Sequence, residues 1–107
     1  MDYMRETDIE KLVNSEDWGD RHSIAVSLRV PKKYLTKLSK DENVSVRCAV
    51  ATNPNTLKED IINMFEDKNW RVRELAKDEL ERRKKQEEVL PWLRKNSRQE
   101  SITNLFN

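Results

Sequence analysis

A seven-residue pattern that occurs twice, 26 residues apart, constrains this chain more than any other feature. Residues 41–47 read DENVSVR and residues 67–73 read DKNWRVR. Compared with itself at a shift of 26, the sequence keeps its register without gaps over three units. The coinciding sets are Ile9, Leu35 and Ile61; Leu12, Leu38 and Met64; Trp18, Val44 and Trp70; Arg21, Arg47 and Arg73; and Ile24, Val50 and Ala76. This period predicts a repeat array in which stacked neighbours supply one another's core.

Each unit has the apolar spacing of two short helices. The expected helices run to about Asn14, from Trp18 to about Leu28, from Pro31, from Val44 to Thr52, from Thr56, and from Trp70 for some twenty residues to Pro91. We therefore expect an all-α fold: a short right-handed α-solenoid of about three helix pairs. Residues 1–90 would form the repeat domain, and residues 91–107 a C-terminal tail.

Several helix boundaries are predicted from local chemistry. Thr7 with Glu10, and Thr56 with Glu59, have the spacing of capping boxes. Asp17 is suited to cap the second helix. The segment 53–55, Asn-Pro-Asn, is a breaker, because the residue before a proline is pushed out of the α region.

Composition limits the classes of partner and compartment. The chain carries 21 Lys and Arg against 20 Asp and Glu, so no overall field draws it to nucleic acid or to an acidic membrane. One cysteine, Cys48, excludes an internal disulfide framework and suits a reducing compartment. With no apolar run long enough for a signal peptide or a membrane span, we expect a cytoplasmic monomer that does not enter a membrane.

The middle of the chain resembles a known type of repeat. Residues 41–56, DENVSVRCAVATNPNT, resemble the repeat of the leucine-rich repeat variant (LRV) proteins and, more loosely, HEAT-like arrays. The resemblance covers roughly residues 17–80 and implies an α-solenoid. The LRV type member also holds an iron–sulfur centre in a cysteine cluster. Because this chain has only Cys48, we expect no cofactor.

Candidate catalytic and metal-binding groups do not form a convincing site. His22, Cys48 and Glu74 lie 26 residues apart and so occupy the same position, or slot, in successive units. Stacked helices lie about 8–10 Å apart, whereas zinc needs its ligands within about 2.0–2.3 Å. The sequence offers no nucleophile with a recognisable base and no glycine-rich phosphate loop. We expect neither a metal site nor an enzyme.

The recurring arginines have two interpretations. Arg21, Arg47 and Arg73 could line a groove and bind phosphates, as in HEAT-like nucleic-acid-binding proteins. Alternatively, each arginine could pair with a turn aspartate, such as Asp41 or Asp67, and tie one unit to the next. The second interpretation is favoured. For the tryptophans that share a slot, Trp18 and Trp70, packing between repeats is expected. The charged run 82–85 is expected to lie on a solvated helix face.

The C-terminal segment resembles a different kind of motif. Gln99, Ile102, Leu105 and Phe106 fill the four places of the PIP box, the peptide by which proteins dock on the sliding clamp PCNA. The resemblance implies that the three apolar side chains enter a pocket on the clamp, while the glutamine forms hydrogen bonds beside it. Leu105 stands where the eukaryotic pattern prefers an aromatic residue, and a Leu-Phe ending is also similar to bacterial clamp-binding peptides.

Three hypotheses about function follow. The first is a non-enzymatic protein-interaction module that docks on a sliding clamp in DNA replication or repair. The second is a nucleic-acid-binding repeat domain that uses the arginine slots. The third is a scaffold for an unrelated protein, with the tail as a short helix, capped by Ser97, that packs on the last repeat.

Overall fold

The computed structural model describes residues 5–100, except for the side chains of Trp92 and of residues 94–100. Over these residues the protein is all-helical, with no strand, as the sequence predicts. The helices are α1 (Glu6–Val13), α2 (Trp18–Ala25), α3 (Lys32–Leu38), α4 (Val44–Thr52), α5 (Lys58–Asn63), the short 3-10 helix η1 (Met64–Glu66) and α6 (Trp70–Glu100).

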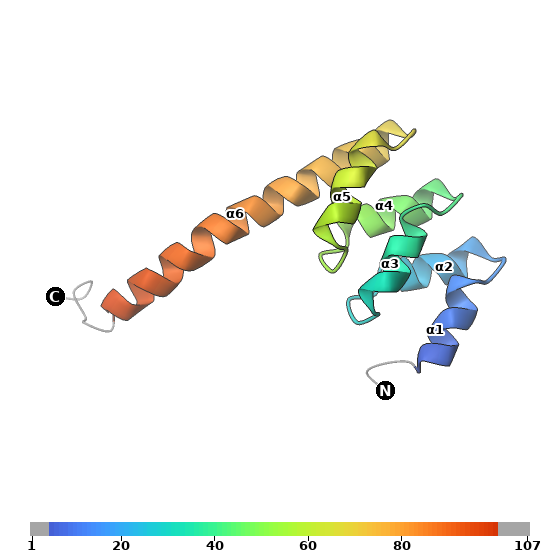
Figure 1. Ribbon diagram of the computed structural model, residues 1–107, viewed down its shortest axis with the longest axis horizontal. Coiled ribbons are helices and arrows are strands. Elements are labelled where there is room, and N and C mark those ends of the chain that lie inside the picture. Colours follow the sequence, from blue (N-terminus) through green and yellow to red (C-terminus); the bar gives the residue numbers. More distant parts are fainter. Residues whose placement is uncertain (1–4, 101–107) are drawn as a thin grey trace.

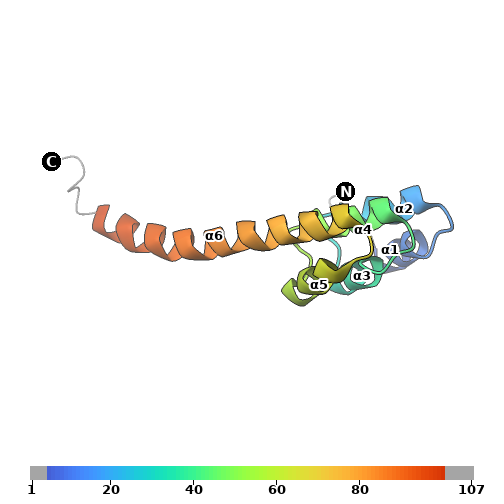
Figure 2. The same ribbon diagram turned by 90° about the horizontal axis from the view of Figure 1, so that it is seen from above.

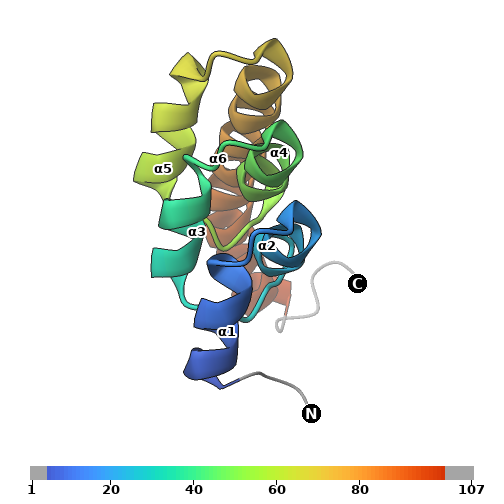
Figure 3. The same cartoon turned by 90° about the vertical axis from the view of Figure 1, so that its right-hand side faces the viewer.

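The helices are arranged in two rows. Seen from the side, α1, α3 and α5 form one row and α2, α4 and the start of α6 form the other (Figure 3). The same two layers are visible from above (Figure 2). Within the second row α4 packs against both α2 and α6, and each helix of the first row packs against the helix that follows it in the chain. The chain thus forms three successive pairs: α1 with α2, α3 with α4, and α5 with α6.

The core lies between the two rows and includes two of the sets of positions that coincide at a shift of 26. Ile24, Val50 and Ala76 are completely buried in the second row. In the first row, Ile9, Leu35 and Ile61 are also buried. The prediction that these positions form the core is therefore confirmed. Each helix pair has only a narrow stripe of apolar side chains, so this stripe is fully buried only when the neighbouring pairs pack against it.

Two helix starts are capped by side chains, at Asp17 as predicted and at Asn43. The Asp17 carboxylate accepts a hydrogen bond from the Gly19 amide at 2.9 Å, and α2 begins between them. The Asn43 side chain accepts from the amide of Ser45 at 2.8 Å and from that of Val46 at 3.2 Å. These bonds satisfy amide groups that have no partner within the first turn of a helix.

Both predicted capping boxes are wrong. Thr7 lies inside α1, which begins at Glu6 without a side-chain cap. Thr56 lies before α5 and is buried, and its hydroxyl donates to the Val50 carbonyl at 2.7 Å. The hydroxyl of Thr56 therefore closes the preceding turn, and this contact competes with the local capping geometry that the sequence pattern suggests.

The Asn53 side chain links the second pair to the first. Its amide nitrogen donates to the carbonyl of Ala25 at 2.8 Å and to that of Ser27 at 2.7 Å. Its oxygen accepts from the Asn55 amide at 2.8 Å. The breaker at 53–55 thus ends α4 as predicted and also satisfies carbonyl groups left free at the end of α2.

The last helix is longer than predicted. The sequence predicts an end at Pro91, whereas α6 runs through Pro91 to Glu100 and leaves the rest of the protein (Figure 1). Strong helix formers flank the proline on both sides, which favours continuation although one backbone hydrogen bond is lost. The predicted domain boundary between residues 90 and 91 therefore falls within a helix. None of the helices in the described part of the chain is long and apolar enough to cross a membrane.

Candidate functional site

Two of the recurring arginines bind aspartates of the next helix pair. Arg21 in α2 donates from Nε to Asp41 Oδ2 at 2.7 Å and from Nη2 to Asp41 Oδ1 at 3.2 Å. Arg47 in α4 contacts Asp67 in the same way, at 2.8 Å and 3.2 Å. The third nitrogen, Nη1, donates to the carbonyl of Ser15 in the first case and of Asp41 in the second. We call each such arrangement an arginine tie.

The arginine ties are buried. The side chain of Arg21 is 11% exposed and that of Arg47 is 6% exposed. A guanidinium group that meets a carboxylate through two parallel hydrogen bonds presents no free edge to a phosphate. The described geometry therefore matches the interpretation in which the arginine joins two units, and it weighs against the use of these two residues on nucleic acid.

The surface beside the arginine ties repeats as well. A hollow of about 460 Å³ lies beside the first tie and one of about 350 Å³ beside the second. Every residue that lines the second hollow is 26 positions after a residue that lines the first. The first is lined by Val13, Asn14, Ser15, Glu16, Arg21, Lys37, Leu38, Lys40, Asp41 and Glu42. The second is lined by Ser39, Lys40, Asp41, Glu42, Arg47, Asn63, Met64, Glu66, Asp67 and Lys68.

Arg73, the third arginine of the set, has only part of this arrangement. Its Nη1 donates to the Asp67 carbonyl at 2.8 Å, as in the other two units. Among the described residues no carboxylate lies within ion-pair distance of its guanidinium group. The position that would supply the aspartate, 26 residues after Asp67, is Leu93.

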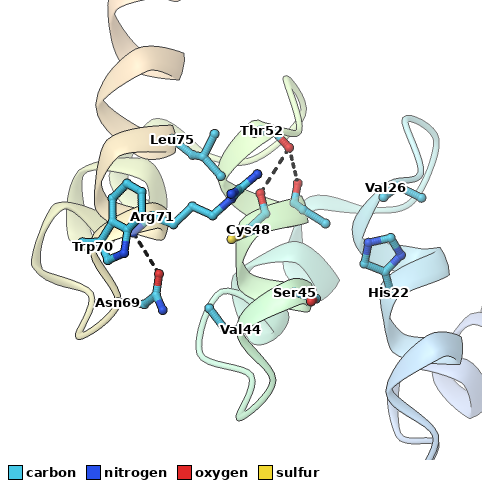
Figure 4. A pocket seen from close by; sticks show the side chains of 11 residues that line it. His22, Val26, Val44, Ser45, Cys48, Thr52, Asn69, Trp70, Arg71 and Leu75 are labelled. Carbon is cyan, nitrogen blue, oxygen red and sulfur yellow. Dashed lines mark hydrogen bonds between the residues drawn. The ribbon is translucent and has the colours of Figure 1, made fainter.

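An open groove lies on the outer side of the second row, across α2, α4 and α6 (Figure 4). Its volume is about 670 Å³. Side chains from one face of α4 form its floor, and α2 and α6 form its two walls. The lining residues are His22, Val26, Val44, Ser45, Cys48, Ala49, Thr52, Asn69, Trp70, Arg71 and Leu75. We call this surface the α2–α4–α6 groove.

Two tryptophans at and beside this groove are exposed. Trp70 is 64% exposed and Trp18 is 47% exposed. The predicted role of these residues in packing between repeats is therefore wrong. Their shared slot is the first position of α2 and of α6, at the outer rim of the second row, where no neighbouring helix covers it. Trp18 instead contacts the His22 ring edge-on, with 5.9 Å between the ring centroids.

The Cys48 thiol in the groove is not activated. Burial raises the pKa of the Cys48 thiol, and the positive charges of Arg71 and Arg47 oppose this effect only in part. A thiol with a raised pKa stays protonated near neutral pH and is a poor nucleophile. In the described part of the chain no three His, Cys, Asp or Glu side chains lie close enough together to hold a metal ion.

The charged run at 82–85 lies on α6, and its first two residues bind Glu79. Arg82 and Arg83 donate to the Glu79 carboxylate at 2.7 Å and 2.8 Å. Arg83 also donates to the carbonyls of Asn53 and Pro54. Arg83 therefore joins α6 to the three helix pairs, which are called the stack below. Residues 84–91, which follow it, are all exposed.

The predicted clamp-binding residues lie at the end of the chain. The backbone of Gln99 belongs to the last turn of α6. Ile102, Leu105 and Phe106 lie outside the described residues. The structure therefore shows where α6 leads the chain, which is away from the stack (Figure 1).

Sequence reasoning did not single out the α2–α4–α6 groove. Val26 and Arg71, which line it, were not among the predicted site residues, because Val26 lies outside the recurring pattern and Arg71 has a serine at the corresponding position of the first copy. One sequence signal for this groove was available. Trp18, Val44 and Trp70 recur at the starts of three helices, and a row of large apolar residues that is not buried in the core indicates an exposed apolar surface. The class of protein that the fold defines is an all-helical protein with an open surface groove. No known protein family, curated protein or solved structure matches this chain.

Proposed function

We propose that this chain is a non-enzymatic protein-interaction module, built as a short right-handed α-solenoid and docking on a DNA sliding clamp through its C-terminal tail. Support for the solenoid comes from the two arginine ties and the two hollows, which recur at the 26-residue period. Support for a role in binding comes from the α2–α4–α6 groove and its exposed Trp70. We further propose that it acts as a cytoplasmic monomer, because its lone Cys48 fits a reducing compartment.

The observation that carries the proposal is the direction of α6. This helix has 31 residues, so at about 1.5 Å per residue it is about 46 Å long. Arg83, near the middle of α6, still contacts the stack through the Asn53 carbonyl. Beyond it, α6 carries the chain well away from the stack to Glu100. A peptide that follows such a helix can enter a pocket on a large ring-shaped partner without a clash between the partner and the stack.

The energetics of such a tail are adequate for a transient interaction. Burial of the side chains of Ile102, Leu105 and Phe106 is worth about 1.5–3 kcal/mol each. Ordering the tail and losing rotational and translational freedom offset part of this gain. A net binding free energy near −8 kcal/mol would give a dissociation constant of about 1 μM.

Isothermal titration calorimetry of the full chain tests the proposal. The titrations use a PCNA-type clamp and a bacterial-type clamp, because Leu105 fits either class of partner. We expect micromolar binding to one of them and at least a tenfold loss for Phe106→Ala. Asn104→Ala, between two positions of the motif, is the matched control and should bind normally. Absence of heat with both clamps, or equal binding by the Phe106→Ala variant, would refute clamp docking.

A further inference from the structure

The arginine slot of one helix pair binds the next pair in the stack. Arg21 of the first pair reaches Asp41 of the second, and Arg47 of the second reaches Asp67 of the third. In both ties the aspartate lies in the turn before the second helix of its pair. Its Oδ1 also accepts a backbone amide two residues on, from Asn43 and from Asn69, each at 2.8 Å. The partner of the slot is therefore an aspartate in a helix–turn–helix segment.

Arg73 is held in the same way as its counterparts, but no further helix pair follows it among residues 5–100. The bond from its Nη1 to the Asp67 carbonyl, at 2.8 Å, reproduces the backbone contact of Arg21 and Arg47. The chain then continues straight along α6, and Leu93 occupies the sequence position of the missing aspartate. The Nε and Nη2 edge of Arg73 is thus positioned for a carboxylate that the described residues do not supply.

Two apolar side chains of the third pair, like Arg73, occupy repeat positions that in the second pair face the next helix pair. The Thr36 hydroxyl bonds to the Asp60 carboxylate of the next pair, so this slot faces the next pair. The corresponding residue of the third pair is Ile62, which is 42% exposed. Similarly, Ser39 borders the third pair in the second hollow, and its counterpart Phe65 is only partly buried.

The surface made by Ile62, Phe65 and Arg73 is called the C-terminal face below. Terminal units of repeat arrays ordinarily end in a polar outer face, because no neighbour covers it. At the positions of the first two pairs that correspond to Ile62 and face the next pair, the chain has Glu10 and Thr36, which are both polar. The C-terminal face is therefore more apolar at this position than either internal junction.

We propose that the C-terminal face binds a helix–turn–helix segment of another protein, which adds to the stack as its next pair. The segment would carry an aspartate in its turn for Arg73 and an apolar residue on its first helix for Ile62. A second copy of this chain does not fit, because its first pair has Ser15 where the aspartate is required. The two apolar residues favour a protein segment over a nucleic-acid phosphate. This inference rests on the stacked fold and is independent of the C-terminal tail.

The chain itself supplies a probe of suitable chemistry. A synthetic peptide with the sequence of residues 32–52 contains Asp41, the natural partner of Arg21, and Tyr34 in the slot that faces the preceding pair. On the C-terminal face, Asp41 of the peptide would bind Arg73 and Tyr34 would lie against Ile62. The full-length protein is titrated with this peptide and with its Asp41→Asn version, and binding is followed by amide chemical shifts.

We expect saturable binding, perturbed amides at Ile62, Phe65 and Arg73, and affinity about tenfold weaker for the Asp41→Asn peptide, since charge-assisted bonds are lost. Arg73→Gln should abolish the difference between the two peptides. Arg71→Gln, in the α2–α4–α6 groove, is the control and should preserve it. Ile62→Asp, at an exposed position, should weaken binding of both peptides, whereas Val26→Asp in the groove should not.

Three results would overturn the inference. These are the absence of saturable binding up to millimolar peptide, equal affinity of the two peptides for the unmodified protein, and shift changes confined to groove residues such as Thr52 and Trp70. Because Arg73→Gln also removes the bond to the Asp67 carbonyl, its fold is checked by circular dichroism. Ile62→Asp tests the surface without touching that bond. Clamp binding by the tail should be unaffected by either variant, so failure here leaves the proposed function intact.

Discussion

Charged residues are buried and paired in the stack but exposed to solvent in the outer half of α6. In the stack, charged side chains such as Arg47 and Asp67 are buried and matched, and no buried side-chain polar atom of the described residues lacks a partner. From residue 84 to residue 91 every side chain is exposed, including the apolar Val89 and Leu90. Charge therefore specifies tertiary contacts in one region and only maintains a solvated helix in the other. Substitutions should separate the two regions clearly.

The largest expected effect is the loss of a closed arginine tie. Arg47→Ala leaves Asp67 buried without its cation, which should lower the free energy of unfolding by about 3–5 kcal/mol. Arg73→Ala, at the open slot, removes one bond to a carbonyl and should cost about 1 kcal/mol. Urea denaturation followed by circular dichroism measures both values. Equal losses for the two variants would show that the carboxylate contributes little to the tie.

The second effect concerns the polar junction at the end of α4. Asn53→Ala leaves the carbonyls of Ala25 and Ser27 without their donor and should destabilise the protein by about 1–3 kcal/mol. Asn55→Ala is the matched control at a half-buried site. It loses two exposed bonds, one to the Leu28 carbonyl and a long one from the Lys32 ammonium group, and its effect should be under about 1 kcal/mol. Thermal and urea denaturation provide the comparison. A neutral Asn53→Ala would mean that water replaces the lost donor.

A third prediction concerns how the free energy of unfolding depends on pH through Glu79 in α6. Burial acts to raise the pKa of Glu79, but hydrogen bonds and charge from Arg82 and Arg83 prevail and lower it below 4.5. A carboxyl whose pKa is lower in the folded state stabilises the protein above the unfolded pKa, and this stabilisation is lost as the pH falls through the folded pKa. Unfolding free energies at pH 7 and pH 3 should therefore differ less for Glu79→Gln than for the unmodified protein.

The control for this pH dependence is Glu87→Gln, at an exposed position of the same helix. Its loss of stability between pH 7 and pH 3 should match that of the unmodified protein. If Glu79→Gln behaves like this control, the ion pairs of Glu79 do not contribute to acid stability.

The smallest effect is expected on the outer half of α6. Leu90 is 53% exposed, so Leu90→Gln should change the free energy of unfolding by less than about 0.5 kcal/mol. Leu35→Ala, at a fully buried position in the stack, should cost about 2–5 kcal/mol. A Leu90→Gln variant as unstable as Leu35→Ala would show that α6 packs against the stack in solution.

Part of the fold could be predicted from local chemistry alone. The bounds of α4 follow from the Asn43 cap and the breaker at 53–55, because both act within a few residues. The capping boxes at Thr7 and Thr56 could not be assessed in this way. A threonine hydroxyl has several partners within reach, and for Thr56 the tertiary contact to Val50 prevails.

The candidate surfaces were less accessible to sequence reasoning. A tryptophan that recurs at the period of an array is equally compatible with a junction and with an exposed rim, and only the packing of α2 and α6 shows that Trp18 and Trp70 are at the rim. The missing partner of Arg73 could have been found from the sequence, since Leu93 occupies the required position. The predicted end of α6 at Pro91 was wrong because a proline weakens a helix without always ending it.

The sequence by itself determined the period, the helical class and part of the core, because these depend on spacing along the chain. The tertiary structure decided which charges are buried in ties, which tryptophans stay exposed and which face of the last pair is left open. Each of these outcomes depends on whether a neighbouring helix lies over a given side chain. Burial and ion pairing act across space, so the same slot that holds a closed tie at Arg47 is an open surface at Arg73.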